Sequence, residues 1–220
     1  MKIKAVLFDL DGTLINTLAD LCDSANYSLK KMGYPPQPLN NFKMYVGDGI
    51  PKMLERAMPK PMACHSNIEK AKAFFMEYYS VHNSDKTAHY DGMPQLIAEL
   101  RKKGFKTAVV TNKDEKMAKV ILDKLYGENT FDLIFGAREG VPTKPDPTLA
   151  LMAMKELKVL AQECVFIGDS GVDIKTAVNS GAFPVGVLWG FRGRDELVSS
   201  GAKQLINHPS ELISIIDTLE

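Results

Sequence analysis

Short apolar runs rich in β-branched and aromatic residues occur once near the start of the chain and repeatedly in its second half. They cover residues 5–8, 107–110, 133–135, 164–168 and 184–189. Apolar runs of this length without polar alternation are typical of strands buried on both faces of a parallel sheet. The hydrophobic pattern therefore predicts a strand at each of these five places.

Helical patterns separate the later runs. The stretches MPQLIAELRKKG (93–104), DPTLALMAMKEL (146–157) and SELISIIDTLE (210–220) each place apolar residues at helical spacing. Pro94 and Pro147 stand where a first helical residue is expected, and Gly104 stands where the first of these helices should stop. Strand and helix thus alternate from residue 90 onward, which predicts a doubly wound α/β sheet.

Residues 16–88 interrupt this alternation, because they contain no convincing strand pattern. Apolar residues recur at helical spacing from Leu18 to Met32, after a start at Thr17 and Asp20 that resembles a capping box. We therefore expect a helical cap domain at 16–88, inserted into an α/β domain made of 1–15 and 89–220. An insert that follows the carboxyl end of the first strand is positioned to act as a lid over the ligand-binding edge of an open sheet.

Composition excludes some classes of partner. The 220 residues carry 27 Lys+Arg and 27 Asp+Glu, so the formal net charge is zero. This balance gives no electrostatic case for binding nucleic acid or an anionic membrane surface. The sequence contains no signal-peptide pattern and no window suited to spanning a bilayer. Three widely spaced cysteines suit a reducing compartment, so we expect a soluble cytoplasmic protein.

Polar residues that could bind a ligand or take part in catalysis directly follow the predicted strands. They are Asp9 and Asp11 after 5–8, Thr111 and Asn112 after 107–110, and Asp169, Ser170 and Asp173 after 164–168. Lys144 lies in the loop after 133–135. Because the carboxyl ends of parallel strands share one edge of the sheet, we expect these side chains to gather in one crevice.

Such a set of side chains suits phosphoryl transfer. Clustered carboxylates need a neutralising cation, and an oxygen-only ligand set points to Mg²⁺. A lysine and a hydroxyl could then hold phosphate oxygens, while a spare carboxylate attacks the phosphorus atom and forms an aspartyl-phosphate. Each motif alone has a simpler interpretation, since Asp and Gly are common in turns and Asp173 could be a first-turn helix acid.

Four motifs in sequence order resemble those of haloacid dehalogenase superfamily phosphatases. They are FDLDGT (8–13), VVTN (109–112), Lys144-Pro145 and GDSGVD (168–173). The resemblance covers essentially the whole chain and includes the helical cap. It implies that Asp9 is the nucleophile and a Mg²⁺ ligand. It also implies that Asp11 is the general acid/base, with its backbone carbonyl on the metal.

The same resemblance assigns the remaining polar residues. Thr111, with Asn112 beside it, would bind the phosphate, and Lys144 would hold both the nucleophile and the phosphoryl group. Asp169 would complete the Mg²⁺ shell, and Asp173 would orient metal-bound water or Lys144.

Within the superfamily, the chain most resembles the phosphoglycolate phosphatases. The stretches VGDGI (46–50) and VGVLWGFR (185–192) carry this resemblance, whereas Asn16 departs from it, since many relatives have an acid there. It implies a small phosphorylated metabolite as substrate, with 2-phosphoglycolate the best choice. It further implies a cap loop at Gly47, Asp48 and Gly49 that reaches the substrate, and a monomer or homodimer.

Two alternatives remain open. A phosphomutase of the β-phosphoglucomutase type would share the architecture and return the phosphoryl group to a sugar. A non-catalytic binding protein could also stand on the same fold. The complete set Asp9, Asp11, Lys144 and Asp169 argues against the second, because a decayed site usually loses one of its members.

Overall fold

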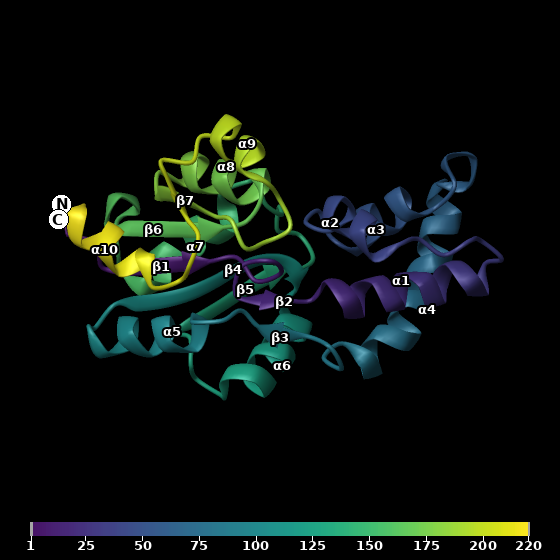
Figure 1. Ribbon diagram of the computed structural model, residues 1–220, viewed down its shortest axis with the longest axis horizontal. Helices are drawn as coiled ribbons and strands as arrows, with labels where there is room; N and C mark the ends of the chain where they lie inside the picture. Colours follow the sequence, from purple (N-terminus) through teal and green to yellow (C-terminus); the bar gives the residue numbers. More distant parts are fainter. Residues whose placement is uncertain (1, 220) are drawn as a thin grey trace. The chain divides into compact units, whose positions relative to one another are not determined.

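The computed structural model of the chain describes residues 2–219, which divide into two compact units (Figure 1). One unit, here called the sheet unit, consists of residues 2–15 and 89–219 of the described chain. The other, here called the helical unit, consists of Asn16–Ala88. In the described part of the chain, no helix combines the length and the apolar character needed to cross a bilayer.

The sheet unit is built on a six-stranded sheet with the order β5-β4-β1-β6-β7-β8, in which all neighbouring strands are parallel. The strands are β1 (Ala5–Phe8), β4 (Lys106–Asp114), β5 (Leu133–Ala137), β6 (Cys164–Gly168), β7 (Phe183–Val187) and β8 (Gln204–Ile206). This confirms the predicted doubly wound parallel sheet. Five of the strands coincide with the apolar runs, while β8 was not predicted.

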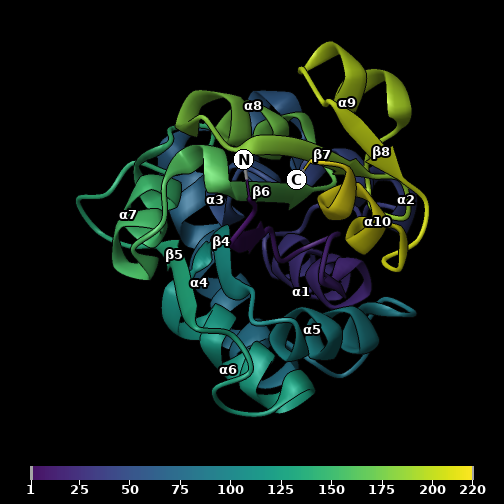
Figure 2. The same ribbon diagram turned by 90° about the vertical axis from the view of Figure 1, so that its left-hand side faces the viewer.

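Helices cover both faces of this sheet (Figure 2). They are α5 (Met93–Lys102), α6 (Glu115–Tyr126), α7 (Thr148–Leu157), α8 (Gly171–Ser180), α9 (Arg194–Ser199) and α10 (Glu211–Thr218), with a 3₁₀ turn η2 (Ala161–Glu163). Apolar residues of α5, α6 and α10 share one core cluster, and those of α7 and α8 share another. The sheet is therefore a middle layer between two helical layers.

The alternation of side chains along β1 explains why both faces must be covered. Val6 and Phe8 belong to the core on the α5 side, whereas Ala5 and Leu7 belong to the core on the α7 side. All four are fully buried, and burying one large apolar side chain contributes about 1.5–3 kcal/mol. An unpaired charge inside the strand would oppose this burial, so polar chemistry begins only where β1 ends.

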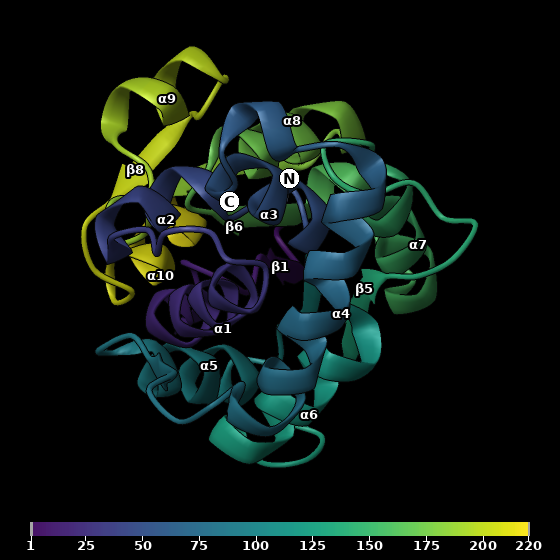
Figure 3. The same cartoon turned by 90° about the vertical axis from the view of Figure 1, so that its right-hand side faces the viewer.

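The helical unit contains four helices and a 3₁₀ turn: α1 (Leu18–Lys31), α2 (Leu39–Tyr45), α3 (Ile50–Ala57), η1 (Lys60–Met62) and α4 (His65–His82). Helices α1 and α4 lie side by side (Figure 3), where the Ser28 hydroxyl donates to the Ala71 carbonyl oxygen at 2.7 Å and the rings of Tyr27 and Tyr78 stack. At the segments that join the two units, the short strands β2 (Ile15–Asn16) and β3 (Ala88–His89) pair with each other.

The start of α1 differs from the predicted capping box. Thr17 is the N-cap residue, but its side chain makes no capping hydrogen bond, and within residues 2–219 its buried hydroxyl has no partner. The buried Asp20 carboxylate instead accepts hydrogen bonds from the backbone N–H groups of Lys86 and Thr87 and from the Thr87 hydroxyl, at 2.6–3.1 Å. The prediction was wrong because this carboxylate binds a segment distant in sequence.

We expect Asp20→Ala to lower the free energy of unfolding by about 2–4 kcal/mol, because it leaves several buried hydrogen-bond donors without an acceptor. Urea unfolding would measure this loss. Asp23→Ala is the matched control on the same helix, since Asp23 makes a partly exposed ion pair with Lys86 at 2.6 Å worth only about 0.2–1 kcal/mol. Equal losses for the two variants would contradict the role given to Asp20.

Candidate active site

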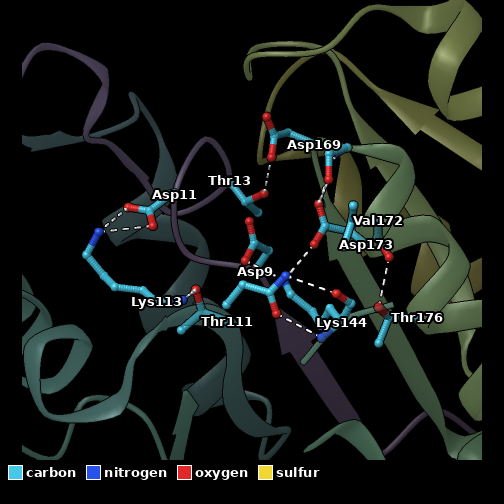
Figure 4. Close-up of polar contacts among 12 residues, drawn as sticks. Asp9, Asp11, Thr13, Thr111, Lys113, Lys144, Asp169, Val172, Asp173 and Thr176 are labelled. Carbon is cyan, nitrogen blue, oxygen red and sulfur yellow. Dashed lines mark hydrogen bonds and ion pairs between the residues drawn. The ribbon is translucent and has the colours of Figure 1, made fainter. Parts of the chain in front are cut away.

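The candidate site lies at the carboxyl ends of three adjacent strands of the sheet unit (Figure 4). Strand β1 pairs with β4 on one side and with β6 on the other. Asp9 directly follows β1 and Asp169 directly follows β6. Thr111 does not follow its strand as predicted, because β4 continues to Asp114; it lies inside β4, two residues beyond Val109, the partner of Phe8. Parallel pairing thus brings together residues separated by more than half of the chain, at the edge where open α/β sheets bind ligands.

Lys144 joins two of the carboxylates. Its Nζ atom lies 2.6 Å from an oxygen of Asp9 and 2.6 Å from an oxygen of Asp173 (Figure 4). Asp9, Lys144 and Asp173 are 7%, 4% and 1% exposed. Charge-assisted hydrogen bonds this short hold both partners in one geometry, so the Asp9 carboxylate is fixed beside a buried cation.

Asp173 has a second role at the start of α8. Its other carboxylate oxygen accepts hydrogen bonds from the backbone N–H and the hydroxyl of Ser170, at 3.0 and 2.6 Å. These bonds form a capping box in which Ser170 is the N-cap residue. Asp173 is therefore a first-turn helix acid that also contacts Lys144.

Asp169 is held by backbone that approaches it closely. One carboxylate oxygen accepts the Phe191 backbone N–H at 2.7 Å, and the other lies 3.5 Å from the Thr13 hydroxyl. Gly12 and Gly190 both lie so close that a Cβ atom at either position would overlap the Asp169 side chain. Gly12 also has φ +96°, a conformation that L side chains rarely adopt. Sequence reasoning did not identify the role of Gly190.

We expect Gly12→Ala to reduce activity at this site by about 100-fold, because the added methyl group would displace the Asp169 carboxylate while the backbone resists the change. Gly104→Ala is the matched control: Gly104 has φ +83°, and nothing lies within 4 Å of a Cβ atom built there. It should lose stability only. Steady-state phosphate release checks both variants, and a similar loss of activity in Gly104→Ala would contradict this explanation.

Burial shifts the pKa values of the ionisable groups in this site. Burial, followed by the neighbouring Asp173 charge, raises the pKa of Asp9 to about 7, although Lys144 lowers it. Burial and the charge of Asp173 also raise the pKa of Asp169 well above its ordinary value. For Lys144, burial lowers the pKa, but the Asp173 and Asp9 charges outweigh this effect and raise it. One lysine therefore does not neutralise three carboxylates.

The three carboxylates fit a hard divalent cation. Asp9, Asp169 and Asp173 can each offer one oxygen, and these three oxygens lie within 4.8 Å of one another. All three are buried, and clustered buried carboxylates need a neutralising cation. Carboxylate oxygens are the ligands that Mg²⁺ prefers. The donor set therefore suits such an ion.

Asn112 and Thr111 make local contacts. The Asn112 side-chain amide donates to the Lys144 carbonyl oxygen at 3.0 Å, and its oxygen accepts the Lys144 backbone N–H at 2.8 Å. The Thr111 hydroxyl accepts the Lys113 backbone N–H at 3.2 Å and is almost fully buried. These two bonds fix the backbone that carries Lys144, and the role of Asn112 in phosphate binding stays a prediction.

A second buried lysine, Lys113, contacts Asp11 and was not predicted from the sequence. Lys113 Nζ lies 3.0 and 3.1 Å from the two carboxylate oxygens of Asp11. In Figure 4, the Asp11 carboxylate faces Lys113, on the other side of Asp9 from Asp169 and Asp173. Asp9 and Asp11 therefore form ion pairs with different lysines, Asp9 with Lys144 and Asp11 with Lys113.

The predicted cap loop lies in the helical unit, between α2 and α3. Gly47 and Gly49 have φ values of +124° and +84°, which explains glycine at both positions. The Asp48 carboxylate pairs with the guanidinium of Arg56 at 2.6 Å, and the same guanidinium donates to the Tyr45 carbonyl oxygen at 2.9 Å. Arg56 therefore fixes the shape of this loop.

The chain is similar in sequence and in fold to known proteins. A family model described as haloacid dehalogenase-like hydrolase matches residues 6–187. A phosphoglycolate phosphatase from Pseudomonas putida is 33% identical over 193 residues, which cover 86% of this chain and 70% of the relative. An N-acetylmuramic acid 6-phosphate phosphatase from Pseudomonas aeruginosa is 31% identical over 219 residues, which cover 99% and 96%.

Among solved structures, a candidate phosphoglycolate phosphatase from Lactobacillus delbrueckii subsp. bulgaricus superimposes with a TM-score of 0.92 and 31% identity, and the match covers 98% of this chain and 99% of the other. These matches confirm the predicted resemblance to phosphoglycolate phosphatases. Because the family model spans most of the sequence and includes the strand-end acids, the chain belongs to the haloacid dehalogenase-like hydrolase family.

Proposed function

We propose that this hydrolase cleaves small phosphomonoesters through a phosphorylated Asp9, with Mg²⁺ as its cofactor. The observation that carries the proposal is the short contact of Lys144 with both Asp9 and Asp173, at 2.6 Å each, beside Asp169. This arrangement fixes a carboxylate nucleophile next to groups that can hold a phosphoryl dianion. It supports phosphoryl transfer more directly than any other chemistry of these residues.

In the first step, an Asp9 carboxylate oxygen attacks phosphorus and the bond from phosphorus to the leaving oxygen breaks. Asp11 gives its proton to that oxygen, so the product leaves as an alcohol. The Lys144 ammonium and the Thr111 hydroxyl hold the phosphoryl oxygens, and Asn112 keeps Lys144 in place through its backbone. In the second step, water attacks phosphorus, Asp11 takes up its proton, and inorganic phosphate leaves Asp9 free.

Asp9, Asp169 and the Asp11 backbone carbonyl would hold the Mg²⁺ ion, and Asp173 would orient its water or Lys144. When bound, the ion supplies positive charge that lets an anionic carboxylate approach an anionic phosphoryl group. The three buried carboxylates Asp9, Asp169 and Asp173, which can each bring one oxygen within 4.8 Å of the others, support this assignment.

We infer that the substrate is a small metabolite, with 2-phosphoglycolate as the best single choice. The phosphoglycolate phosphatases among the relatives support this choice, but a relative of similar identity carries the name of an amino-sugar phosphatase. The loop of Gly47, Asp48 and Gly49 in the helical unit is the proposed substrate-contacting segment, and residues 16–88 are the proposed lid. We further propose a cytoplasmic monomer or homodimer, which the three unpaired cysteines suit.

A phosphate-release screen tests this function. The purified chain would be incubated with 2-phosphoglycolate, N-acetylmuramic acid 6-phosphate, sugar phosphates and other small phosphomonoesters, with Mg²⁺ and with excess EDTA. We expect Mg²⁺-dependent release of phosphate, fastest with 2-phosphoglycolate. If every substrate stays intact with Mg²⁺, the proposed function is wrong.

The same screen separates the phosphomutase alternative. With β-glucose 1-phosphate, a phosphatase forms free glucose and inorganic phosphate, whereas a mutase forms glucose 6-phosphate. Product analysis by ³¹P NMR distinguishes the two activities. If glucose 6-phosphate accumulates as the main product, the protein is a phosphomutase and the proposed hydrolysis is wrong.

A further inference from the structure

We propose that Lys113 is a positioning residue that holds the Asp11 carboxylate in the orientation needed for proton transfer. The inference rests on the proposed function, in which Asp11 is the general acid and base. It concerns a residue outside the four sequence motifs, and three observations carry it: the geometry of the contact, the burial of the lysine, and the irregular backbone that delivers it.

The contact is bidentate and buried. Lys113 Nζ reaches both oxygens of Asp11, at 3.0 and 3.1 Å, and the side chains of Lys113 and Asp11 are 4% and 14% exposed. A surface ion pair adds little because water competes for both partners, but a buried lysine is rare and needs a partner of opposite charge. Contact with both oxygens also restricts rotation of the carboxylate plane. A contact with only one oxygen would not restrict this rotation.

The backbone of β4 is irregular where Lys113 lies. Val110 pairs with Phe135 and Asp114 pairs with Ala137, so four steps along β4 match two steps along β5. A bulge of this kind redirects side chains and is common beside active sites. The Lys113 backbone N–H also donates to the Thr111 hydroxyl at 3.2 Å. The bulge therefore links the residue proposed to bind phosphate with the residue that holds Asp11.

The two buried lysines contact different carboxylates. Lys144 contacts Asp9 and Asp173, while Lys113 contacts Asp11. Without Lys113, the Asp11 carboxylate would lose the contact that fixes both of its oxygens. Because proton transfer requires donor and acceptor within hydrogen-bond reach, a small rotation of this carboxylate is enough to slow it.

A double-mutant cycle on the full chain tests this role. Lys113→Met removes the charge and keeps most of the side-chain length, and Asp11→Asn removes the proton carrier. We expect Lys113→Met to lower kcat by about 10–100-fold, part of the about 10²–10⁴-fold that a positioned acid/base supplies. KM should stay within about threefold, because the lysine acts through Asp11 and does not bind substrate. In the Asp11→Asn background the same change should alter kcat by less than about twofold.

The control variant is Lys116→Met, an exposed lysine on α6, which should leave kcat unchanged. Lys113→Arg keeps the charge and should recover part of the lost kcat. If Lys113→Met does not fold, as judged by circular dichroism, Lys113→Gln takes its place in the cycle. The substrate is the fastest one found in the phosphate-release screen.

Equal losses of kcat with and without Asp11 would overturn the inference, since they would mean that Lys113 acts on substrate or on the fold. A rise in KM with unchanged kcat would overturn it too, because it would make Lys113 a binding residue. Both outcomes leave the proposed function intact, since the wild-type chain still releases phosphate. A wild-type chain that releases no phosphate would instead defeat the proposed function, and this inference with it.

Discussion

Asp9→Asn is expected to lower phosphate release by about 10⁴-fold or more, because an amide cannot replace the carboxylate as nucleophile. The change keeps the shape of a side chain that is 7% exposed and lies 2.6 Å from Lys144. The fold should therefore persist while the chemistry stops. Continuous phosphate release with excess Mg²⁺ and the best substrate measures the effect.

Asp217→Asn is the matched control for this prediction. It makes the same chemical change at an exposed residue of α10 and should leave the rate within about twofold, since surface changes away from the site have small effects. If Asp9→Asn retained more than a tenth of the wild-type rate, Asp9 would not be the nucleophile.

Lys144→Met is expected to lower phosphate release by about 10³-fold. Removing this cation leaves Asp9 and Asp173 buried beside each other without their shared partner, so they take up protons and Asp9 loses nucleophilic character. The phosphoryl oxygens also lose a positive charge that the transition state needs. Single-turnover rates measured with excess enzyme separate this loss of chemistry from slow product release.

Lys119→Met, at an exposed position of α6, is the control for Lys144→Met and should keep the wild-type rate. Lys144→Arg should stay strongly impaired, because a planar guanidinium does not reproduce two 2.6 Å contacts from one nitrogen atom. A Lys144→Met variant with normal single-turnover rates would refute the role of this lysine.

The sheet could be predicted because its central strands are buried on both faces. The run at 5–8 becomes β1 without a change of bounds, since all four of its residues lie in the core. Strand β8 escaped prediction because it has only three residues and pairs at the edge of the sheet. A run that short carries no detectable period. The capping box at Thr17 failed for a related reason, because the partner of Asp20 is 66 residues away.

The placement of Asp9, Thr111 and Asp169 at one edge could be predicted because strand ends are readable in sequence and parallel strands align them. The ion pair of Lys113 with Asp11 could not, because it depends on the bulge in β4. A regular strand would have given Lys113 a different direction. Gly190 was equally hidden, since its closeness to Asp169 arises only when the chain after β7 folds back.

Trapping the phosphorylated enzyme tests the proposed role of Asp9 most directly. Asp11→Asn should slow hydrolysis of the aspartyl-phosphate, because the base that activates water is gone. The variant would be mixed with Mg²⁺ and acetyl phosphate, whose acetate leaving group departs without a proton from Asp11, so that only the second step depends on the missing base. The protein would then be quenched in acid and digested, and its peptides would be mapped by mass spectrometry. We expect one added phosphoryl group on the peptide that contains Asp9, and none when Asp9 is also changed to Asn. A phosphoryl group on any other residue, or phosphate release by the wild-type chain with no phosphorylated peptide in either protein, would contradict it.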